Sequence, residues 1–337
     1  MRARGPGRVN LLGEHTDYNA GLCLPFAVEA GVTVDAVATA TGEIEAEALA
    51  YGEGDRFDAA DPQPADGWRA FVRGTVAELA TTGVPTAGAR LRIESDLPEG
   101  AGLSSSAALG SALCLALLAV ANKPEPDRRE LARLCSRVEH AWVGAQTGML
   151  DQMAAFFGEP GHALLLDCRD LSVEQVPLSL GGWTLGVADS GSRHEHAESG
   201  YNERRRECAE AARRLGVASL RDAASAEGLP EPLNRRVRHV LSENERVRRG
   251  VQALRSQDMP ALAALLDASH ASLRDDYEVS VPEVEQTVER VKAAGAAGAR
   301  IMGGGFGGAV LALFPPGTEP PDDVLPVAPA QGARLLA

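Results

Sequence analysis

The stretch GAGLSSSAA at Gly100–Ala108 decides the fold, because it joins a strand pattern to a helix pattern through a glycine-rich turn. Before it, Ala89–Ser95 (ARLRIES) alternates apolar and polar residues, as a half-buried strand does. After it, the apolar run Ala107–Ala121 predicts a buried helix. The first N–H groups of a helix lack partners and carry the positive end of its dipole, which suits a phosphate. The segment therefore predicts an anion site at a helix end.

The residue types of this turn support the same prediction. Gly100 and Gly102 let the backbone approach phosphate oxygens closely, and the hydroxyls of Ser104, Ser105 and Ser106 can cap the helix, bind phosphate or reach a magnesium ion. A plain N-cap on a buried helix is the alternative interpretation. No Gly-Lys-Ser/Thr follows, so the turn is not a Walker A loop. The task of that lysine would fall to the helix end, a metal or an arginine.

Strand and helix patterns alternate in both halves of the chain, which predicts an α/β or α+β protein with two lobes. Further strands are expected at Val32–Thr39, Ala163–Leu166, Val173–Val176, Thr184–Ala188 and Ala309–Phe314, and further helices at Trp68–Leu79, Asp127–Val143 and Tyr201–Leu215. Glu53–Gly67 is rich in Gly, Pro and Asp and is expected to be a loop. The segment Pro177–Gly182 separates the expected lobes, residues 1–180 and 181–337. A cleft between lobes is the default place for a ligand.

Composition excludes several classes of function. The 337 residues are 45% hydrophobic and 24% charged, an ordinary mixture for a globular protein. The net charge of −14 disfavours a nucleic acid or an anionic membrane surface as partner. No apolar region typical of a secretory signal follows the N-terminus, and the longest apolar run is shorter than the roughly 20 residues of a membrane span. Five scattered cysteines without a CxxC pair indicate reduced thiols, so we expect a cytoplasmic protein.

A second polar segment, GRVNLLGEHTDYN at Gly7–Asn19, packs a cation, two carboxylates, an imidazole, amides and hydroxyls around an apolar anchor. Mixed donors and acceptors suit a ligand with many hydroxyl groups. Two alternatives stay open for Glu14–Asp17. One is a metal site, although the spacing lacks the paired histidines of a helical zinc site, and the other is a structural turn.

Two further segments are weaker when taken alone. In EHAWVGAQTGMLDQ, Glu139 ends a helix pattern and Asp151 follows a glycine turn, so that the two acids could face one pocket in magnesium-binding and base roles. In GGGFGG, five glycines at Gly303–Gly308 could follow a ligand closely or simply form a tight turn. His194-Glu195-His196 suggests a metal site, but a loop is the simpler interpretation.

In this order and spacing, the segments resemble the GHMP small-molecule kinases, and GRVNLLGEHTDYNAGLCLP resembles the galactokinase family within them. GLSSSAAL is similar to the phosphate loop of that family, GGGFGGAVLAL to its third motif, and Gly191–Cys208 to further family sequence. The resemblance covers nearly the whole chain. It implies a two-lobed GHMP kinase fold, with a ribosomal-S5-like N-terminal lobe and a ferredoxin-like C-terminal lobe. It also implies phosphorylation of the C1 hydroxyl of D-galactose, with ATP and Mg²⁺ bound between the lobes.

The resemblance also implies roles for individual residues. Asp151 and Arg8 match the catalytic pair. The sugar contacts would be Glu14, His15, Thr16, Asp17, Gly148 and Tyr201; the nucleotide contacts Trp68, Gly100, Ala101, Gly102, Leu103, Ser104, Ser105 and Ser106; and the magnesium ligands Ser106 and Glu139.

The chemistry of the reaction agrees with these roles. The C1 hydroxyl is a poor nucleophile, and an aspartate can accept its proton while a nearby arginine favours the ionised carboxylate. N-acetylgalactosamine and L-arabinose remain alternative substrates, because a few side chains decide sugar specificity. A sugar- and ATP-binding signalling protein without catalysis is a further alternative. The sequence leaves the oligomeric state open, with a monomer as one option.

Overall fold

A computed structural model describes residues 1–84, 88–98, 100–193 and 197–336, so His194-Glu195-His196 lies outside the described residues. Its helices are α1 (Trp68–Thr81), α2 (Ser105–Val120), α3 (Arg128–Val138), α4 (Leu150–Phe157), α5 (Ala197–Leu215), α6 (Leu233–Ser256), α7 (Met259–Asp275) and α8 (Pro282–Ala293). Short helical turns are η1 (Asp17–Asn19), η2 (Glu139–Val143) and η3 (Leu220–Asp222). The strands are β1 (Arg2–Asn10), β2 (Leu22–Cys23), β3 (Pro25–Ala38), β4 (Glu43–Ala48), β5 (Glu53–Asp58), β6 (Ala89–Ser95), β7 (His162–Asp167), β8 (Ser172–Pro177), β9 (Thr184–Arg193), β10 (Gly298–Met302), β11 (Gly307–Phe314), β12 (Val324–Val327) and β13 (Arg334–Leu336).

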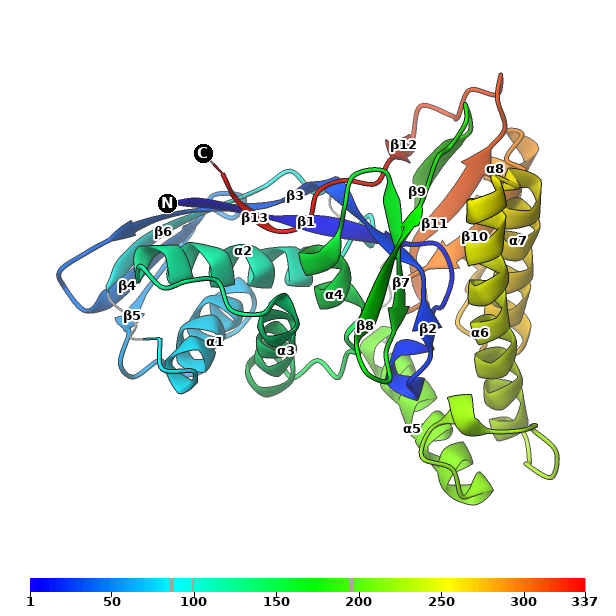
Figure 1. Ribbon diagram of the computed structural model, residues 1–337, viewed down its shortest axis with the longest axis horizontal. Coiled ribbons are helices and arrows are strands. Elements are labelled where there is room, and N and C mark those ends of the chain that lie inside the picture. Colours follow the sequence, from blue (N-terminus) through cyan, green and yellow to red (C-terminus); the bar gives the residue numbers. More distant parts are fainter. Residues whose placement is uncertain (85–87, 99, 194–196, 337) are drawn as a thin grey trace.

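The strands form three sheets (Figure 1). A six-stranded sheet in the order β13-β1-β3-β6-β4-β5 carries α1–α4 on one side, and a four-stranded antiparallel sheet in the order β10-β11-β9-β12 lies beside α6–α8. The small sheet β2-β7-β8 lies between them. β13 pairs with β1, so the end of the chain returns to the first sheet, and the division at residue 180 stays a prediction.

Most predicted elements are found, with instructive exceptions. β6 has the predicted bounds, and the apolar helix is α2, which packs on β1 and β3. The loop predicted at Glu53–Gly67 is wrong for its first part, which is β5. Only Phe57 of this edge strand is buried, so it lacks the apolar alternation of a half-buried strand. The predicted helix Asp127–Val143 is α3, continued by the π-helical turn η2.

The apolar anchor of the polar segment at 7–19 joins the two halves of the molecule. Val9, Leu11 and Leu12 are completely buried in a core that also contains Val247 of α6 and Leu311 of β11. Burial of apolar surface on both sides of this anchor fixes the polar residues that flank it. In the described part of the chain, no helix has the length and apolarity that crossing a membrane would require.

Candidate active site

An ion pair between β1 and α4 forms the centre of the site. Arg8 Nε lies 2.7 Å from Asp151 Oδ1, and Nη2 lies 3.1 Å from Oδ2, a two-pronged geometry that fixes both side chains. Arg8 Nη1 also donates to the carbonyl of Gly102 at 2.5 Å. Burial lowers the pKa of Arg8, but the charges of Asp151 and Glu14 outweigh it and raise the pKa overall. The guanidinium therefore remains a cation.

A cavity of about 360 Å³ opens beside this ion pair. The predicted residues that line it are Arg8, Glu14, His15, Asp17, Gly148, Asp151 and Tyr201. Strand β1, the loop that follows it, the segment from Gly148 into α4 and the start of α5 therefore bring together residues that are far apart in the sequence. The size falls within the range of small-molecule sites.

Thr16 is the exception among the predicted sugar contacts. It is completely buried and does not line the cavity. Its Oγ1 lies 2.8 Å from the carbonyl oxygen of Gly13 and 2.7 Å from that of Leu22. The Thr16 hydroxyl thus stabilises the loop between Gly13 and Leu22 and does not face the cavity.

His15 presents an uncharged ring to the cavity. Burial, followed by the nearby His239, Arg204 and Arg300, lowers the pKa of His15 well below its usual value. Its Nδ1 lies 2.9 Å from the hydroxyl of Tyr18, whereas its buried Nε2 has no partner among the described residues. The backbone is left-handed here (φ 60°), a strained conformation for this residue type. Such strain and an unpartnered polar atom fit a ligand contact.

Asp17 is the most strongly perturbed carboxylate of the cavity. Burial, followed by the charge of Asp151, raises its pKa to about 7. Tyr201 lies close by, and burial followed by the charge of Asp17 raises the pKa of the Tyr201 phenol well above its usual value. Asp17 can therefore change its charge near neutral pH, while Tyr201 stays a hydroxyl donor.

A second cavity, of about 520 Å³, surrounds the glycine- and serine-rich turn. All of Gly100–Ser106 lines it, together with Gly303–Gly308 from the other half of the molecule. Ser104 precedes α2 in a left-handed conformation and makes no side-chain cap. Its hydroxyl instead donates to Asp151 Oδ2. This geometry favours the anion site over a plain N-cap, because no Ser104 side chain occupies the N–H groups of the first turn.

A third cavity, of about 270 Å³, adjoins the second at Ser105 and Ser106. Trp68 and Phe71 line it with Tyr51, and the buried Nε1 of Trp68 has no partner among the described residues. A flat aromatic pocket with an unused donor suits a nucleobase. The second cavity also shares Arg8 and Gly303–Gly305 with the first, so the three cavities form one continuous series.

Glu139, in η2, lies beside Ser106 of the glycine- and serine-rich turn. It is 3% exposed, and burial raises its pKa, while hydrogen bonds from Thr147 and Ser106 lower it and the charge of Asp151 raises it further. A buried carboxylate beside a hydroxyl and a second carboxylate provides the oxygen ligands that Mg²⁺ prefers, and a cation there would relieve the repulsion. These residues therefore fit a magnesium ion. Within the described ranges, no group of three His, Cys, Asp or Glu side chains forms a metal cluster, so Glu14–Asp17 is not one.

Several residues of the site escape local sequence patterns. Gln152 lies beside Glu139, and both of its side-chain amide atoms are buried. Ser192 and Asn202 line the cavities. Arg300 is completely buried, and its Nη2 lies 2.7 Å from Glu14 Oε1. Arg300 lies just before GGGFGG, and Ser192 and Asn202 lie within Gly191–Cys208, so these segments were the available signal. A spacing pattern, however, does not show a contact across the fold.

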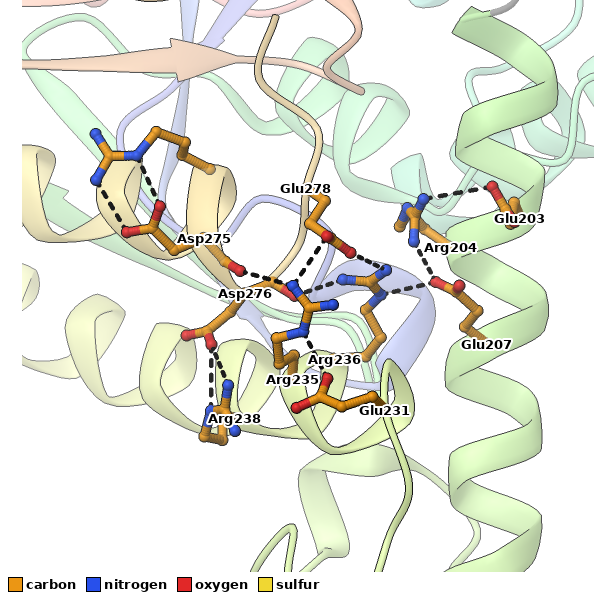
Figure 2. Close-up of polar contacts among 11 residues, drawn as sticks. Glu203, Arg204, Glu207, Glu231, Arg235, Arg236, Arg238, Asp275, Asp276 and Glu278 are labelled. Atoms are coloured by element: carbon orange, nitrogen blue, oxygen red, sulfur yellow. Dashed lines mark hydrogen bonds and ion pairs between the residues drawn. The ribbon is translucent and has the colours of Figure 1, made fainter.

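A network of ion pairs supports α5, which carries Tyr201 (Figure 2). Arg236 of α6 is 1% exposed and lies 2.7 Å from Glu207 of α5 and 2.7 Å from Glu278. Glu207 also binds Arg204 at 2.5 Å. Figure 2 shows these side chains converging from α5, from the start of α6 and from the segment after α7. The network therefore ties α5 to the helices behind the cavity.

Comparisons with known proteins agree with this geometry. Three family models match: the galactokinase galactose-binding signature at residues 1–38, the GHMP kinases N terminal domain at residues 70–159, and the GHMP kinases C terminal model at residues 251–327. A galactokinase of Roseiflexus sp. is 42% identical over 323 residues, which cover 92% of this chain and 82% of that protein. A galactokinase of Streptomyces coelicolor is 42% identical over 329 residues, with 91% and 83% covered.

Solved structures give the same result for the fold. Lactococcus lactis galactokinase, crystallised with galactose, matches with a TM-score of 0.91 at 32% identity over 99% of this chain and 95% of that one. The mevalonate kinase of Methanococcus jannaschii shares the fold, with a TM-score of 0.69 at 18% identity over 94% and 90%. The two-lobed GHMP kinase fold expected from the sequence is thus confirmed. The characteristic segments of this family line the adjoining cavities described above. The chain belongs to the galactokinase family of the GHMP kinases.

Proposed function

We propose that this protein transfers the γ-phosphoryl group of ATP to the C1 hydroxyl of D-galactose, giving galactose 1-phosphate and ADP. The observation that carries the proposal is the shared wall of two cavities, made by Arg8 and Gly303–Gly305. A sugar in the first cavity and a triphosphate in the second would meet at Arg8. Proximity of the two reactants is what a direct phosphoryl transfer requires.

The nucleotide is assigned to the second and third cavities. Its phosphates would lie against Gly100–Ser106 and the N-terminus of α2, and its base against Trp68. Ser106 and Glu139 would hold a magnesium ion. When bound, this ion supplies positive charge that offsets the charge of the phosphates.

The sugar is assigned to the first cavity. Glu14, Asp17 and the Nε2 atom of His15 offer groups for its hydroxyls, with Tyr201 as a further donor and Gly148 leaving room beside Asp17. Thr16 is assigned to holding the loop and not to direct contact.

Asp151 and Arg8 are assigned to the chemical step. The C1 oxygen forms a bond to the γ-phosphorus, the bond from that phosphorus to the bridging oxygen breaks, and ADP leaves. Asp151 accepts the proton of the C1 hydroxyl, and Arg8 stabilises the ionised carboxylate and the charge on the moving phosphoryl group. The hydroxyl of Ser104 donates a hydrogen bond to Asp151 Oδ2 as well.

A coupled assay of ADP release tests the proposal. D-galactose should give turnover far above that of D-glucose, with N-acetylgalactosamine and L-arabinose as the informative competitors. If N-acetylgalactosamine or L-arabinose gave a higher kcat/KM than D-galactose, that sugar would be the preferred substrate instead. Binding of sugar and ATP without ADP release would instead favour a binding protein over an enzyme.

We also propose a cytoplasmic protein that acts on small molecules without a nucleic-acid or membrane partner. All five cysteines are free thiols, as expected in a reducing compartment, and the net charge of −14 disfavours polyanions. A monomer is the proposed state, which light scattering of the purified protein would test.

A further inference from the structure

The two largest completely buried side chains of the described part of the molecule are both arginines, Arg236 and Arg300. Burying a guanidinium is costly unless its donors are satisfied. Arg236 meets the ion-pair network of α5 and α6 (Figure 2). Arg300, on β10, instead reaches the polar segment that lines the first cavity.

Arg300 holds this segment through several contacts. Its Nη1 donates to the carbonyls of Asn10 and Leu11 at 3.0 and 2.7 Å, and its Nε donates to the carbonyl of Ile301 at 2.9 Å. Its Nη2 forms an ion pair with Oε1 of Glu14 at 2.7 Å, without hydrogen-bond geometry. One planar guanidinium thus binds the backbone at Asn10 and Leu11 and also pairs with the carboxylate of Glu14.

The two oxygens of Glu14 have different surroundings. Oε1 forms the ion pair with Arg300 and accepts a hydrogen bond from the backbone N–H of Gly303 at 2.9 Å. No hydrogen bond or ion pair of Oε2 is found among the described residues, and Glu14 lines the cavity although it is only 5% exposed. Oε1 is therefore the anchored oxygen, and Oε2 is the one left for a ligand.

We propose that Arg300 is a positioning residue for sugar binding, which fixes Glu14 so that Oε2 accepts a hydrogen bond from a sugar hydroxyl. This inference rests on the proposed function and extends it to a residue outside the cavity. Without the guanidinium, the carboxylate of Glu14 would lose its charged partner in a buried position and turn toward Arg8 or solvent. Lysine would keep the charge but not the fork that spans carbonyls and carboxylate.

The test compares Arg300→Met and Arg300→Lys with Arg73→Met, a control at a largely buried arginine of α1 whose ion-pair partner, Asp55, does not line the first cavity. Galactose binding is measured by calorimetry, and KM and kcat by ADP release. Arg300→Met should raise the galactose Kd and KM at least about tenfold, with the KM for ATP changed less than about threefold. Arg300→Lys should fall between it and the wild type, and Arg73→Met should lower Tm while leaving the galactose Kd within about twofold.

A double variant with Glu14→Gln gives the second measurement. Because Arg300 acts through Glu14, adding Arg300→Met to Glu14→Gln should weaken galactose binding by much less than the product of the two single effects. Full additivity, an unchanged galactose Kd in Arg300→Met, or an equal loss in Arg73→Met would overturn the inference. If Arg300→Met does not fold, Arg300→Lys is judged by the same criteria. A wild type that binds and phosphorylates no galactose would refute the proposed function itself, and the inference with it.

Discussion

A Cβ atom on Gly148 would lie only 1.9 Å from Oδ2 of Asp17. The absence of a side chain at residue 148 is thus what gives the Asp17 carboxylate its place at the cavity wall. Any larger residue must displace this carboxylate or move the loop.

Gly148→Ala should therefore raise the KM for galactose by about tenfold or more, with a smaller effect on the KM for ATP. Gly144→Ala is the matched control, since Gly144 belongs to the same loop, has a φ of +86° and leaves open space around an added Cβ. The control should cost roughly 1–2 kcal/mol of stability, because alanine is strained in this left-handed conformation, and leave the galactose KM nearly unchanged. Equal KM values in both variants would refute the steric explanation.

Loss of the carboxylate base or of its arginine should stop turnover. Asp151→Asn and Arg8→Ala are each expected to lower kcat by about 100-fold or more, because each removes a group at the reacting atoms. Circular dichroism checks that each variant is folded, and Asp322→Asn, at an exposed position, controls for loss of one negative charge. Near-full turnover in both variants would contradict the catalytic assignment.

Galactose affinity should depend on pH through Asp17. Its pKa of about 7 means that the carboxylate is protonated below neutral pH and ionised above it. If the ionised form accepts the sugar hydroxyls, affinity falls by up to about tenfold per pH unit below pH 7 and levels off above it. Calorimetry between pH 5 and 8.5 measures this. Asp17→Asn should remove the pH dependence, and an unchanged profile would exclude Asp17 as its source.

The same residue should affect stability with the opposite sign. Because burial raises the pKa of Asp17 from 3.8 to about 7, the folded protein binds a proton that the unfolded chain has lost, so this contribution declines as pH rises from about 4 to about 7. The ligand-free Asp17→Asn variant should therefore gain stability relative to wild type at pH 8 and less at pH 5. Thermal unfolding at both pH values shows the difference, and a gain of equal size at both would contradict it.

Removal of magnesium should stop the reaction, and Glu139 should set the magnesium requirement. EDTA is expected to abolish ADP release, and excess Mg²⁺ to restore it. Glu139→Gln should raise the Mg²⁺ concentration for half-maximal rate by about tenfold or more, because it replaces a charged oxygen ligand by a neutral one. Glu130→Gln, on an exposed face of α3, is the control. An identical magnesium dependence in both variants would disprove the assignment.

The residues that line the cavities could be predicted from the sequence better than the contacts that hold these residues in place. GAGLSSSAA and GEHTD are local segments whose residue types show their chemistry, and Gly100–Ser106 lines one cavity as expected. β6 was predicted with its bounds, because its apolar side chains alternate cleanly. β5 was missed, since an edge strand with one buried side chain carries no such pattern. Arg300 and Glu14 lie 286 positions apart, and no local periodicity shows that two such residues meet.

The loop Gly303–Gly305 forms part of the wall of both the first and the second cavity, and its first N–H binds Glu14. A ligand that moves this loop in one cavity would therefore change the wall of the other cavity as well. Thermodynamic reciprocity then requires that whatever factor galactose applies to the affinity for nucleotide, nucleotide applies to the affinity for galactose. Galactose and nucleotide would therefore not bind independently of each other, because both would contact this loop.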